Sequence, residues 1–282
     1  MKNFDVIIIG SGIAGISAAI EARDLGANVV VLERGYGGGA SGLSGGVVYA
    51  GGGTSIQKEA GIEDTPENMF NYLSQETKGI VKDETLRKFC EDSPAMIEWL
   101  IENGAEFKGT VCEYKTSYPT DQHYLYYSGN EKAWPYTNSA TPAPRGHRQV
   151  APGMSSGNEL MRRLTATAER KGVVIHRLTR VQEWVLEGDR VKGVRVKTVD
   201  LEKMDNHKKI KKYGDKFGNW YPPLGKKLNT VAENLWEKYA TVEEICGEKI
   251  IIAAGGFVFN EHMRSQHIGP YKDISPLGTE GD

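Results

Sequence analysis

An α/β fold with a parallel sheet is predicted by two features of this 282-residue sequence. The first is a short apolar run at residues 4–9 that ends in a glycine-rich turn. The second is an Ala- and Glu-rich segment after that turn, followed by a second strand-like run at residues 28–32. Short β-branched runs that alternate with helix-forming segments are typical of a buried parallel sheet.

The composition excludes several classes of function. With 39% hydrophobic and 26% charged residues, the chain has the make-up of an ordinary soluble globular protein. A net charge of −2 gives no sign of nucleic-acid binding. The longest apolar runs are far too short to span a bilayer, and the N terminus lacks the pattern of a signal peptide. Cys90, Cys112 and Cys246 show no metal-ligand or disulfide spacing, so we predict a reducing, cytoplasmic location.

The turn after the first predicted strand has the form Gly-x-Gly-x-x-Gly, built by Gly10, Gly12 and Gly15. Gly10 permits a tight turn, Gly12 lets the main chain approach a pyrophosphate, and Gly15 lets the following helix pack close to the strand. The N terminus of that helix directs N–H groups and the positive end of its dipole at the phosphates. Ser11 and Ala14 lie in the same turn, and we assign them to the same predicted site.

The segment after the turn completes a β-α-β unit. A helix is predicted over residues 16–25 and ends at Gly26, a common residue after a helix C terminus. The second strand leads into Glu33, which can accept hydrogen bonds from both ribose hydroxyls and would repel a 2′-phosphate. The sequence therefore predicts a Rossmann-like dinucleotide-binding unit over residues 1–54, and a β-α-β unit without a ligand is the alternative.

A glycine–serine stretch at residues 35–54 follows, where a typical NAD-binding domain would continue into another β-α-β repeat. Such a stretch offers N–H groups and small hydroxyls that can follow a pyrophosphate, a ribityl chain and the edge of a flavin. This favours FAD, and a glycine-rich surface loop is the alternative. The contacts that we assign to the cofactor in this region are Arg34, Ser41, Ser44, Gly45 and Gly46.

Residues 5–35 together with residues 41–54 resemble the fumarate reductase/succinate dehydrogenase flavoprotein superfamily, and within it the branch of 3-ketosteroid dehydrogenase-like proteins. Residues 249–259 (KIIIAAGGFVF) are similar to the family strand that returns to the FAD domain. That similarity implies cofactor contacts by Ala254 and Gly255.

The segment at residues 179–196 resembles the family's β-hairpin, so the resemblance implies a β-hairpin appendage to the parallel sheet. The first strand of that hairpin brings a main-chain group against the adenine. In this chain the resemblance assigns that group to Val181. The resemblance covers most of the chain except residues 201–239, and it implies hydride exchange between the flavin and a carbon–carbon bond next to a ketone.

Three departures from the family pattern carry information. No histidine lies between Glu33 and Gly61, so we expect FAD to be bound non-covalently. Pro276 stands where soluble fumarate reductases carry a histidine, which disfavours a dicarboxylate substrate and favours a small apolar ketone. The sequence ends at Asp282, before the capping domain and the late flavin-binding segment that the family implies. We therefore expect an N-terminal portion that works with a C-terminal half, which could be a separate chain.

The middle of the chain supplies the candidate substrate residues. Helices are predicted at residues 67–77, 83–103 and 155–171, with Thr65 as N-cap of the first. An aromatic-rich stretch at residues 114–136 leads to PAPRGHR at 142–148, and it is either the wall of a pocket or a well-packed surface excursion. From composition we select two groups of candidates: Tyr118 and Tyr136 for catalysis, and Tyr49, Arg145 and His147 for substrate contact.

The sequence predicts one FAD-binding domain that spans residues 1–282 and has four parts. They are the nucleotide-binding unit at 1–54, the helical and aromatic excursion at 62–150, the helix, hairpin and insertion at 151–248, and the returning strand at 249–259. The Lys-rich residues 201–228 are interpreted as an insertion in the form of a solvated polar loop, and contact of these lysines with an anionic partner or with membrane headgroups is the alternative. Two other readings stay open beside the ketosteroid enzyme: a fumarate- or enoate-reductase-like flavoprotein and a non-catalytic FAD-binding fragment.

Overall fold

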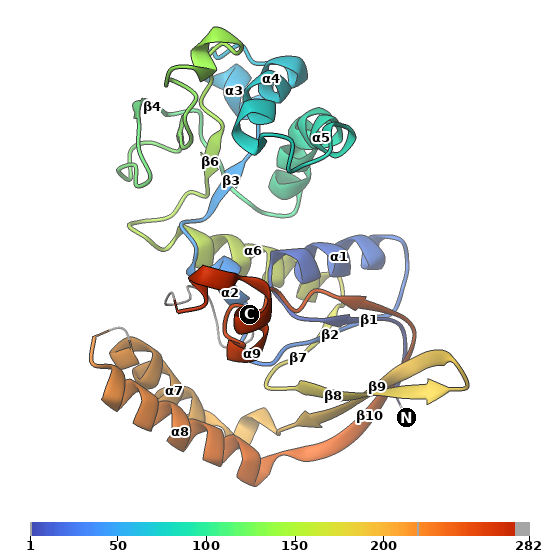
Figure 1. The fold of residues 1–282 in the computed structure, drawn as a ribbon. Helices are drawn as coiled ribbons and strands as arrows, with labels where there is room; N and C mark the ends of the chain where they lie inside the picture. Colours follow the sequence, from blue (N-terminus) through green and yellow to red (C-terminus); the bar gives the residue numbers. More distant parts are fainter. Residues whose placement is uncertain (1, 219, 274–282) are drawn as a thin grey trace. The chain divides into compact units, whose positions relative to one another are not determined.

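The computed structural model describes residues 2–218 and 220–273, and the chain divides into two compact units. Unit 1 comprises residues 1–39 and 168–282, and unit 2 comprises residues 40–167. The helices and strands of both units are labelled in Figure 1. The predicted excursion at residues 62–150 lies entirely within unit 2.

Unit 1 is built on a six-stranded sheet with the order β7-β2-β1-β10-β9-β8. The four strands at one end run parallel to one another. Strand β1 pairs in parallel with both β2 and β10, and β2 pairs in parallel with β7. Figure 1 shows α1, which joins β1 to β2, lying over one face of these strands. The α/β class with a parallel sheet is therefore confirmed. The bounds are β1 (Lys2–Ile9), α1 (Ile13–Asp24), β2 (Val29–Leu32), β7 (Val174–His176) and β10 (Thr241–Ile252).

The long strand β10 joins the parallel and antiparallel parts of this sheet. Its first half pairs antiparallel with β9 (Arg190–Thr198), whose other edge pairs with β8 (Arg180–Glu187). Its second half pairs parallel with β1. The predicted hairpin appendage is therefore confirmed, and it forms a three-stranded antiparallel extension. Apolar side chains from both parts form one core cluster, in which Ile7, Val30 and Val194 are fully buried. Burying each such side chain stabilises the fold by roughly 1.5–3 kcal/mol.

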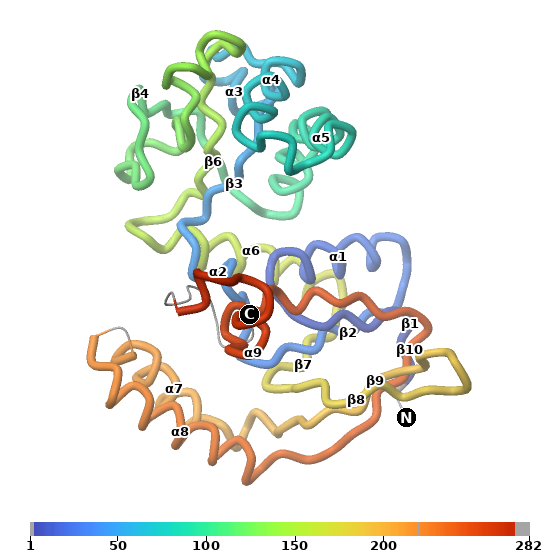
Figure 2. The backbone as a smooth tube through the Cα atoms, viewed as in Figure 1, coloured from blue at the N-terminus to red at the C-terminus, as the bar shows by residue number. Residues whose placement is uncertain are grey.

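The Lys-rich segment does not form the predicted polar loop. It contains a short 3₁₀ turn, η2 (Leu201–Lys203), and two helices, α7 (Asp205–Gly218) and α8 (Pro222–Tyr239). Figure 2 shows the two helices running side by side as a hairpin, and they are in contact along their length. Gly214 of α7 and Gly225 and Ala232 of α8 are buried, so each helix covers part of the other.

Two glycines lie inside these helices at points where the helices come close together. A Cβ added to Gly214 would lie 2.3 Å from Oδ1 of Asn229, and one added to Gly225 would lie 2.4 Å from Cα of Gly218. These glycines therefore allow close packing of α7 against α8.

Unit 2 contains a four-stranded sheet with the order β3-β6-β5-β4. The pair β4–β5 is parallel and the other two pairs are antiparallel. The predicted helices are confirmed, and Oγ of Thr65 accepts a hydrogen bond from the Asn68 amide at 3.1 Å, as the predicted N-cap requires. The strands are β3 (Val47–Tyr49), β4 (Val111–Lys115), β5 (Leu125–Tyr127) and β6 (Gly146–Arg148). The helices are α3 (Ser55–Glu59), α4 (Pro66–Thr77), α5 (Asp83–Glu102) and η1 (Tyr136–Asn138).

Two helices contain the boundaries between the units, α2 (Gly39–Leu43) and α6 (Ser156–Arg170). The described chain ends after α9 (Glu261–His267) and η3 (Gly269–Tyr271). Pro276, used above to argue about the substrate, lies outside the described residues. Among residues 2–218 and 220–273, no helix has the length and apolar character needed to cross a bilayer.

Candidate functional site

The turn between β1 and α1 requires glycine at two of its three predicted positions. Gly10 has φ +102°, and a Cβ there would lie 2.4 Å from the carbonyl oxygen of Ala253. A Cβ on Gly15 would lie 2.0 Å from the carbonyl oxygen of Gly10. The turn, the start of α1 and the end of β10 are thus packed main chain against main chain. The sequence prediction for these two glycines agrees with this geometry.

The N terminus of α1 is arranged to receive an anion. The N-cap residue is Gly12, which has no side chain that could cap the helix. No acidic side chain lies in the first turn of the helix. Gly12 is half-buried and Ala14 is exposed, so the main chain of this turn can be reached from solvent. The positive end of the helix dipole is therefore available to a phosphate.

Glu33 follows β2 and is held beside the turn by three hydrogen bonds. Its Oε2 accepts from the amide of Ser11 at 3.0 Å and from the Ser11 hydroxyl, and its Oε1 accepts from the amide of Gly35. The side chain is buried, yet a carboxylate has about four acceptor positions, so capacity remains for a ribose hydroxyl. The structure therefore holds Glu33 beside the turn, and its contact with a ribose remains a prediction.

A second glycine segment lies against this turn, and it belongs to the predicted glycine–serine stretch at residues 35–54, although its glycines are not among the residues assigned to the cofactor. Gly37, Gly38 and Gly39 all have positive φ. A Cβ on Gly37 would lie 3.6 Å from Oγ of Ser11, and one on Gly39 would lie 3.7 Å from Cα of Gly12. The signal available in the sequence was three consecutive glycines after the acidic residue. They leave the main chain of both segments open to a phosphate-bearing ligand.

Four other predicted contacts lie in unit 1: Arg34 just after β2, Ala254 and Gly255 just after β10, and Val181 on the edge strand β8. Ala254 is adjacent to Gly10, and Gly255 next to it has φ +87°. Val181 on β8 packs against the core cluster that includes Leu32. Arg34 is exposed. Contacts between these residues and a cofactor remain predictions.

The predicted contacts of unit 2 have structural roles of their own. The Ser44 hydroxyl donates to the carbonyl of Ser41 at 2.7 Å and accepts from the amide of Gly46 at 3.2 Å. A Cβ on Gly46 would lie 2.3 Å from the main chain of Ser156, so this glycine is needed for packing against the start of α6. Gly45 is exposed. Cofactor binding by these residues also stays a prediction.

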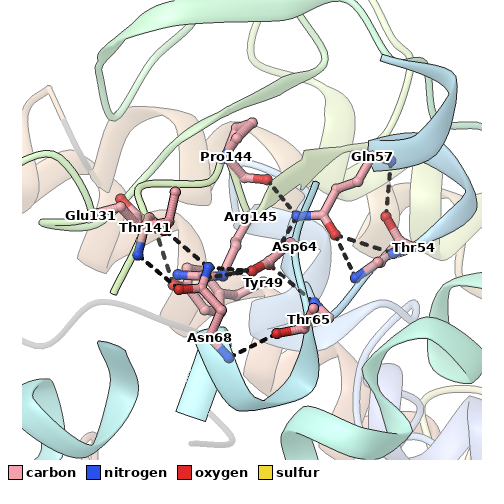
Figure 3. A network of polar contacts seen from close by, with 12 residues as sticks. Tyr49, Thr54, Gln57, Asp64, Thr65, Asn68, Glu131, Thr141, Pro144 and Arg145 are labelled. Atoms are coloured by element: carbon pink, nitrogen blue, oxygen red, sulfur yellow. Dashed lines mark hydrogen bonds and ion pairs between the residues drawn. The ribbon is translucent and has the colours of Figure 1, made fainter. Parts of the chain in front are cut away.

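Arg145 lies in a buried polar network in unit 2, shown in Figure 3. Its Nε and Nη2 donate to the two carboxylate oxygens of Asp64 at 2.9 and 2.8 Å, and both side chains have 0% exposure. Asp64 accepts further hydrogen bonds from Gly52, Gln57 and Asn68. Burial alone would raise the pKa of Asp64, but the hydrogen bonds and charge of Arg145 outweigh it and hold that pKa below its usual value.

Tyr49 and His147 join the same part of unit 2. The Tyr49 hydroxyl donates to Oε1 of Glu131 at 3.2 Å, and burial raises the pKa of Glu131. His147 contacts Oγ1 of Thr54 through Nε2 at 2.9 Å and the carbonyl of Arg145 through Nδ1 at 3.1 Å. A substrate role for these residues stays a prediction, and it would require this buried network to open.

His147 should make the stability of the protein depend on pH. Burial lowers the pKa of His147 to about 4, whereas the pKa of a histidine in an unfolded chain is about 6.5. As the pH falls, the histidine of the unfolded state binds a proton at a higher pH than the buried histidine of the folded state does. The folded state is therefore most stable above about pH 6.5, and it loses stability as the pH falls toward 4. We expect urea unfolding to show a loss of about 1–3 kcal/mol across this window. His147→Gln should flatten that slope and the exposed His262→Gln should not, whereas equal slopes in all three proteins would contradict the assignment.

The two tyrosines selected for catalysis have separate surroundings in unit 2. Tyr118 is 70% exposed. The Tyr136 hydroxyl donates to Oε2 of Glu76 at 3.4 Å, and its ring lies 5.5 Å from that of Tyr72. A catalytic role for either stays a prediction.

The aromatic stretch at residues 114–136 is divided between core and surface. Tyr126 and Tyr127 are buried, and Tyr114 and Trp134 are exposed. A cavity of about 570 Å³ in unit 2 is lined by Tyr124 together with polar groups such as Glu106 and Arg163. The structure therefore favours a packed excursion over an aromatic pocket wall.

Comparison with known proteins gives consistent matches. A profile described as "FAD binding domain" matches residues 5–222. The 3-oxo-5-alpha-steroid 4-dehydrogenase of Comamonas testosteroni is 46% identical over 213 residues, which cover 73% of this chain and 40% of that protein. The NADH:fumarate oxidoreductase of Klebsiella pneumoniae is 28% identical over 197 residues, which cover 69% of this chain and 18% of that protein.

A solved structure agrees with these matches. The 3-ketosteroid-delta4-(5alpha)-dehydrogenase from Rhodococcus jostii RHA1, in complex with 4-androstene-3,17-dione, superposes with a TM-score of 0.79 at 30% identity. The superposition covers 99% of this chain and 51% of that chain. The chain thus spans about half or less of the length of the proteins that it matches.

Proposed function

This chain belongs to the family of FAD binding domains, and from that premise we propose a flavin-dependent oxidoreductase that acts on a carbon–carbon bond next to a ketone. The resemblance predicted from the sequence, to the fumarate reductase flavoproteins and their ketosteroid branch, is confirmed by the similarities above. The single observation that carries the proposal is the turn at Gly10–Gly15 with Glu33 beside it, since it fits the adenosine diphosphate half of FAD.

The residues of unit 1 would hold FAD without a covalent bond. The main chain at Gly12 and Ala14 would receive the pyrophosphate, and Glu33 would accept hydrogen bonds from the ribose. The lack of a histidine between Glu33 and Gly61 supports non-covalent binding. When bound, FAD supplies the flavin N5 that exchanges a hydride with the substrate. The protein's part is to hold the cofactor in a fixed orientation.

A 3-ketosteroid is the proposed substrate class. The support is the 46% identity to a 3-oxo-5-alpha-steroid 4-dehydrogenase and the likeness to an enzyme solved with a bound 3-ketosteroid. Because the chain spans 40% and 51% of those proteins, this reaction is proposed for the whole protein. A tyrosine would remove or supply the one proton that accompanies the hydride, and hydrogen-bond donors would polarise the ketone. Tyr118 and Tyr136 remain the proposed candidates for the first role, and Tyr49, Arg145 and His147 for substrate contact.

The runner-up is reduction of a small enoate, favoured by the likeness to an NADH:fumarate oxidoreductase. The whole protein, loaded with FAD, reduced anaerobically and mixed separately with 4-androstene-3,17-dione and with fumarate, would separate the two. Return of the oxidised flavin absorbance with the steroid alone is the expected result. Return with fumarate alone would replace the steroid proposal, and no return with either would leave a non-catalytic FAD-binding module.

A cytoplasmic location is proposed on the spacing of the cysteines. The thiols of Cys90 and Cys112 are buried in the structure. Pairing with a C-terminal half as a separate chain stays a prediction.

Replacement of Glu33 tests the ribose contact. We expect Glu33→Gln to weaken FAD binding by about 1–3 kcal/mol, because the amide cannot accept hydrogen bonds at both of its heavy atoms. Flavin fluorescence titration measures the change, with the exposed Glu91→Gln as the matched control. An unchanged affinity for FAD would remove Glu33 from the site.

A further inference from the structure

The helical hairpin α7–α8 concentrates positive charge on a chain that is slightly acidic overall. Residues 205–239 contain eight lysines and four acidic residues, which gives the hairpin a net charge of +4, whereas the whole chain carries −2. The FAD site described above uses none of these lysines. The hairpin is therefore a candidate for a separate binding function.

One side of the hairpin has an apolar floor with basic edges. A groove of about 470 Å³ runs between α7 and α8 and is lined by Ile210, Val231 and Leu235, with Lys209 and Lys238 among its other lining residues. Val231 is 45% exposed, although it lies in the middle of a helix. The groove thus combines apolar surface with lysine ammonium groups.

A row of aromatic rings extends this groove toward the end of the hairpin. Tyr213 and Phe217 follow Ile210 at helical spacing, and their ring centroids lie 6.4 Å apart. Phe217 in turn lies 6.3 Å from Trp220. Trp220 is 81% exposed and Tyr213 is 55% exposed.

Lysines accompany the apolar groups along both helices. On α7, Lys216 lies two turns after Lys209, and on α8, Lys227 lies one turn before Val231. Both Lys216 and Lys227 are exposed. We call the whole surface the basic–aromatic face. It consists of Lys209, Ile210, Tyr213, Lys216, Phe217, Trp220, Lys227, Val231, Leu235 and Lys238.

The base of the hairpin is fixed to the rest of unit 1 by other side chains. Trp236 is fully buried, and its indole N–H donates to the carbonyl of Leu178 at 3.0 Å. The guanidinium of Arg180 lies 3.7 Å from the centroid of that ring and pairs with Glu233. These contacts hold α8 through residues that do not belong to the basic–aromatic face. The face therefore does not need to rearrange in order to bind a partner.

We propose that the basic–aromatic face docks the protein on the surface of an anionic lipid bilayer. Amphipathic helices with lysines beside an apolar stripe lie in the plane of such a surface, where the lysines meet headgroup phosphates. Exposed Trp and Tyr side chains favour the boundary between headgroups and acyl chains. Protein–protein interfaces also gather aromatic side chains, but they are depleted in lysine. The bilayer satisfies both features.

Co-sedimentation with vesicles tests the charged part of this proposal. The full chain should bind vesicles of equal parts phosphatidylcholine and phosphatidylserine, and it should not bind pure phosphatidylcholine. The triple variant Lys209→Gln, Lys216→Gln, Lys227→Gln should reduce the partition coefficient by at least about tenfold. The matched control, Lys82→Gln, Lys115→Gln, Lys272→Gln, removes the same charge from exposed positions elsewhere and should bind like the parent.

Tryptophan emission tests the aromatic part. Trp220 and Trp134 are 81% and 79% exposed, so they form a matched pair. A blue shift of the emission on anionic vesicles should persist in Trp134→Phe and disappear in Trp220→Phe. The proposal is overturned if the chain ignores anionic vesicles, if both triple variants lose binding equally, or if Trp220→Phe keeps the shift. A dimer that only the hairpin triple variant dissociates would assign the face to a second copy instead.

Discussion

Gly12→Val is expected to weaken FAD binding by roughly a hundredfold, which is about 2.7 kcal/mol, while the protein stays folded. Gly12 has φ −66° and ψ −179°, a conformation open to any residue. The valine side chain would occupy the space in front of α1 that the pyrophosphate needs and would hinder approach to the N–H groups of the first turn. As an N-cap, valine is poorer than glycine by about 1 kcal/mol, so only a small loss of stability is expected.

Isothermal titration with FAD measures the affinity, and thermal unfolding by circular dichroism measures the stability. Gly218→Val is a suitable control, because a Cβ at Gly218 would meet no described atom within 4 Å. The control should bind FAD like the parent protein. If Gly12→Val bound FAD with the parent's affinity, the pyrophosphate would not lie at this turn.

Asp64→Asn is expected to destabilise the protein by about 3–5 kcal/mol, because it leaves the charge of Arg145 buried without a counter-charge. Replacement of the other partner, Arg145→Met, should lower the stability of the protein by less. Asp64 would keep three other donors, from Gly52, Gln57 and Asn68, at 2.8–3.2 Å. The two single variants are therefore expected to be unequal.

Urea unfolding of the two single variants and of the double variant completes this test. The double variant should be more stable than Asp64→Asn alone, since it removes the unpaired guanidinium. Glu67→Gln, which breaks an exposed ion pair with Arg87, is the control and should change stability by less than about 1 kcal/mol. If the losses of stability in the two single variants simply added up in the double variant, Asp64 and Arg145 would not stabilise the protein as an interacting pair.

The β-α-β unit was predictable from the sequence because its signals are local. The strand at residues 4–9 is β-branched, its turn needs glycine for main-chain packing, and Glu33 follows the next strand at once. The N-cap at Thr65 was predictable for the same reason, since a cap depends on residues three positions apart. Parallel pairing of β1 with β10 is not local, and only the family resemblance suggested it.

Features that depend on distant packing were not predictable. The Lys-rich segment was read as a loop because of its charge and its glycines. Only the partner helix explains why Gly214 and Gly225 lie inside helices. Likewise, Gly51 was placed in a stretch that we assigned to the cofactor. A Cβ there would lie 2.7 Å from Oδ2 of Asp64, so this glycine makes room for the buried pair with Arg145.

Competition binding tests the central claim, that FAD is held through its adenosine diphosphate half by the turn in unit 1. The purified chain would be titrated with FAD, and then ADP and FMN would be added separately as competitors. We predict that ADP displaces FAD and that FMN, which lacks the adenosine, does not. Displacement by FMN with no effect of ADP, or a chain that binds neither FAD nor ADP, would contradict the account.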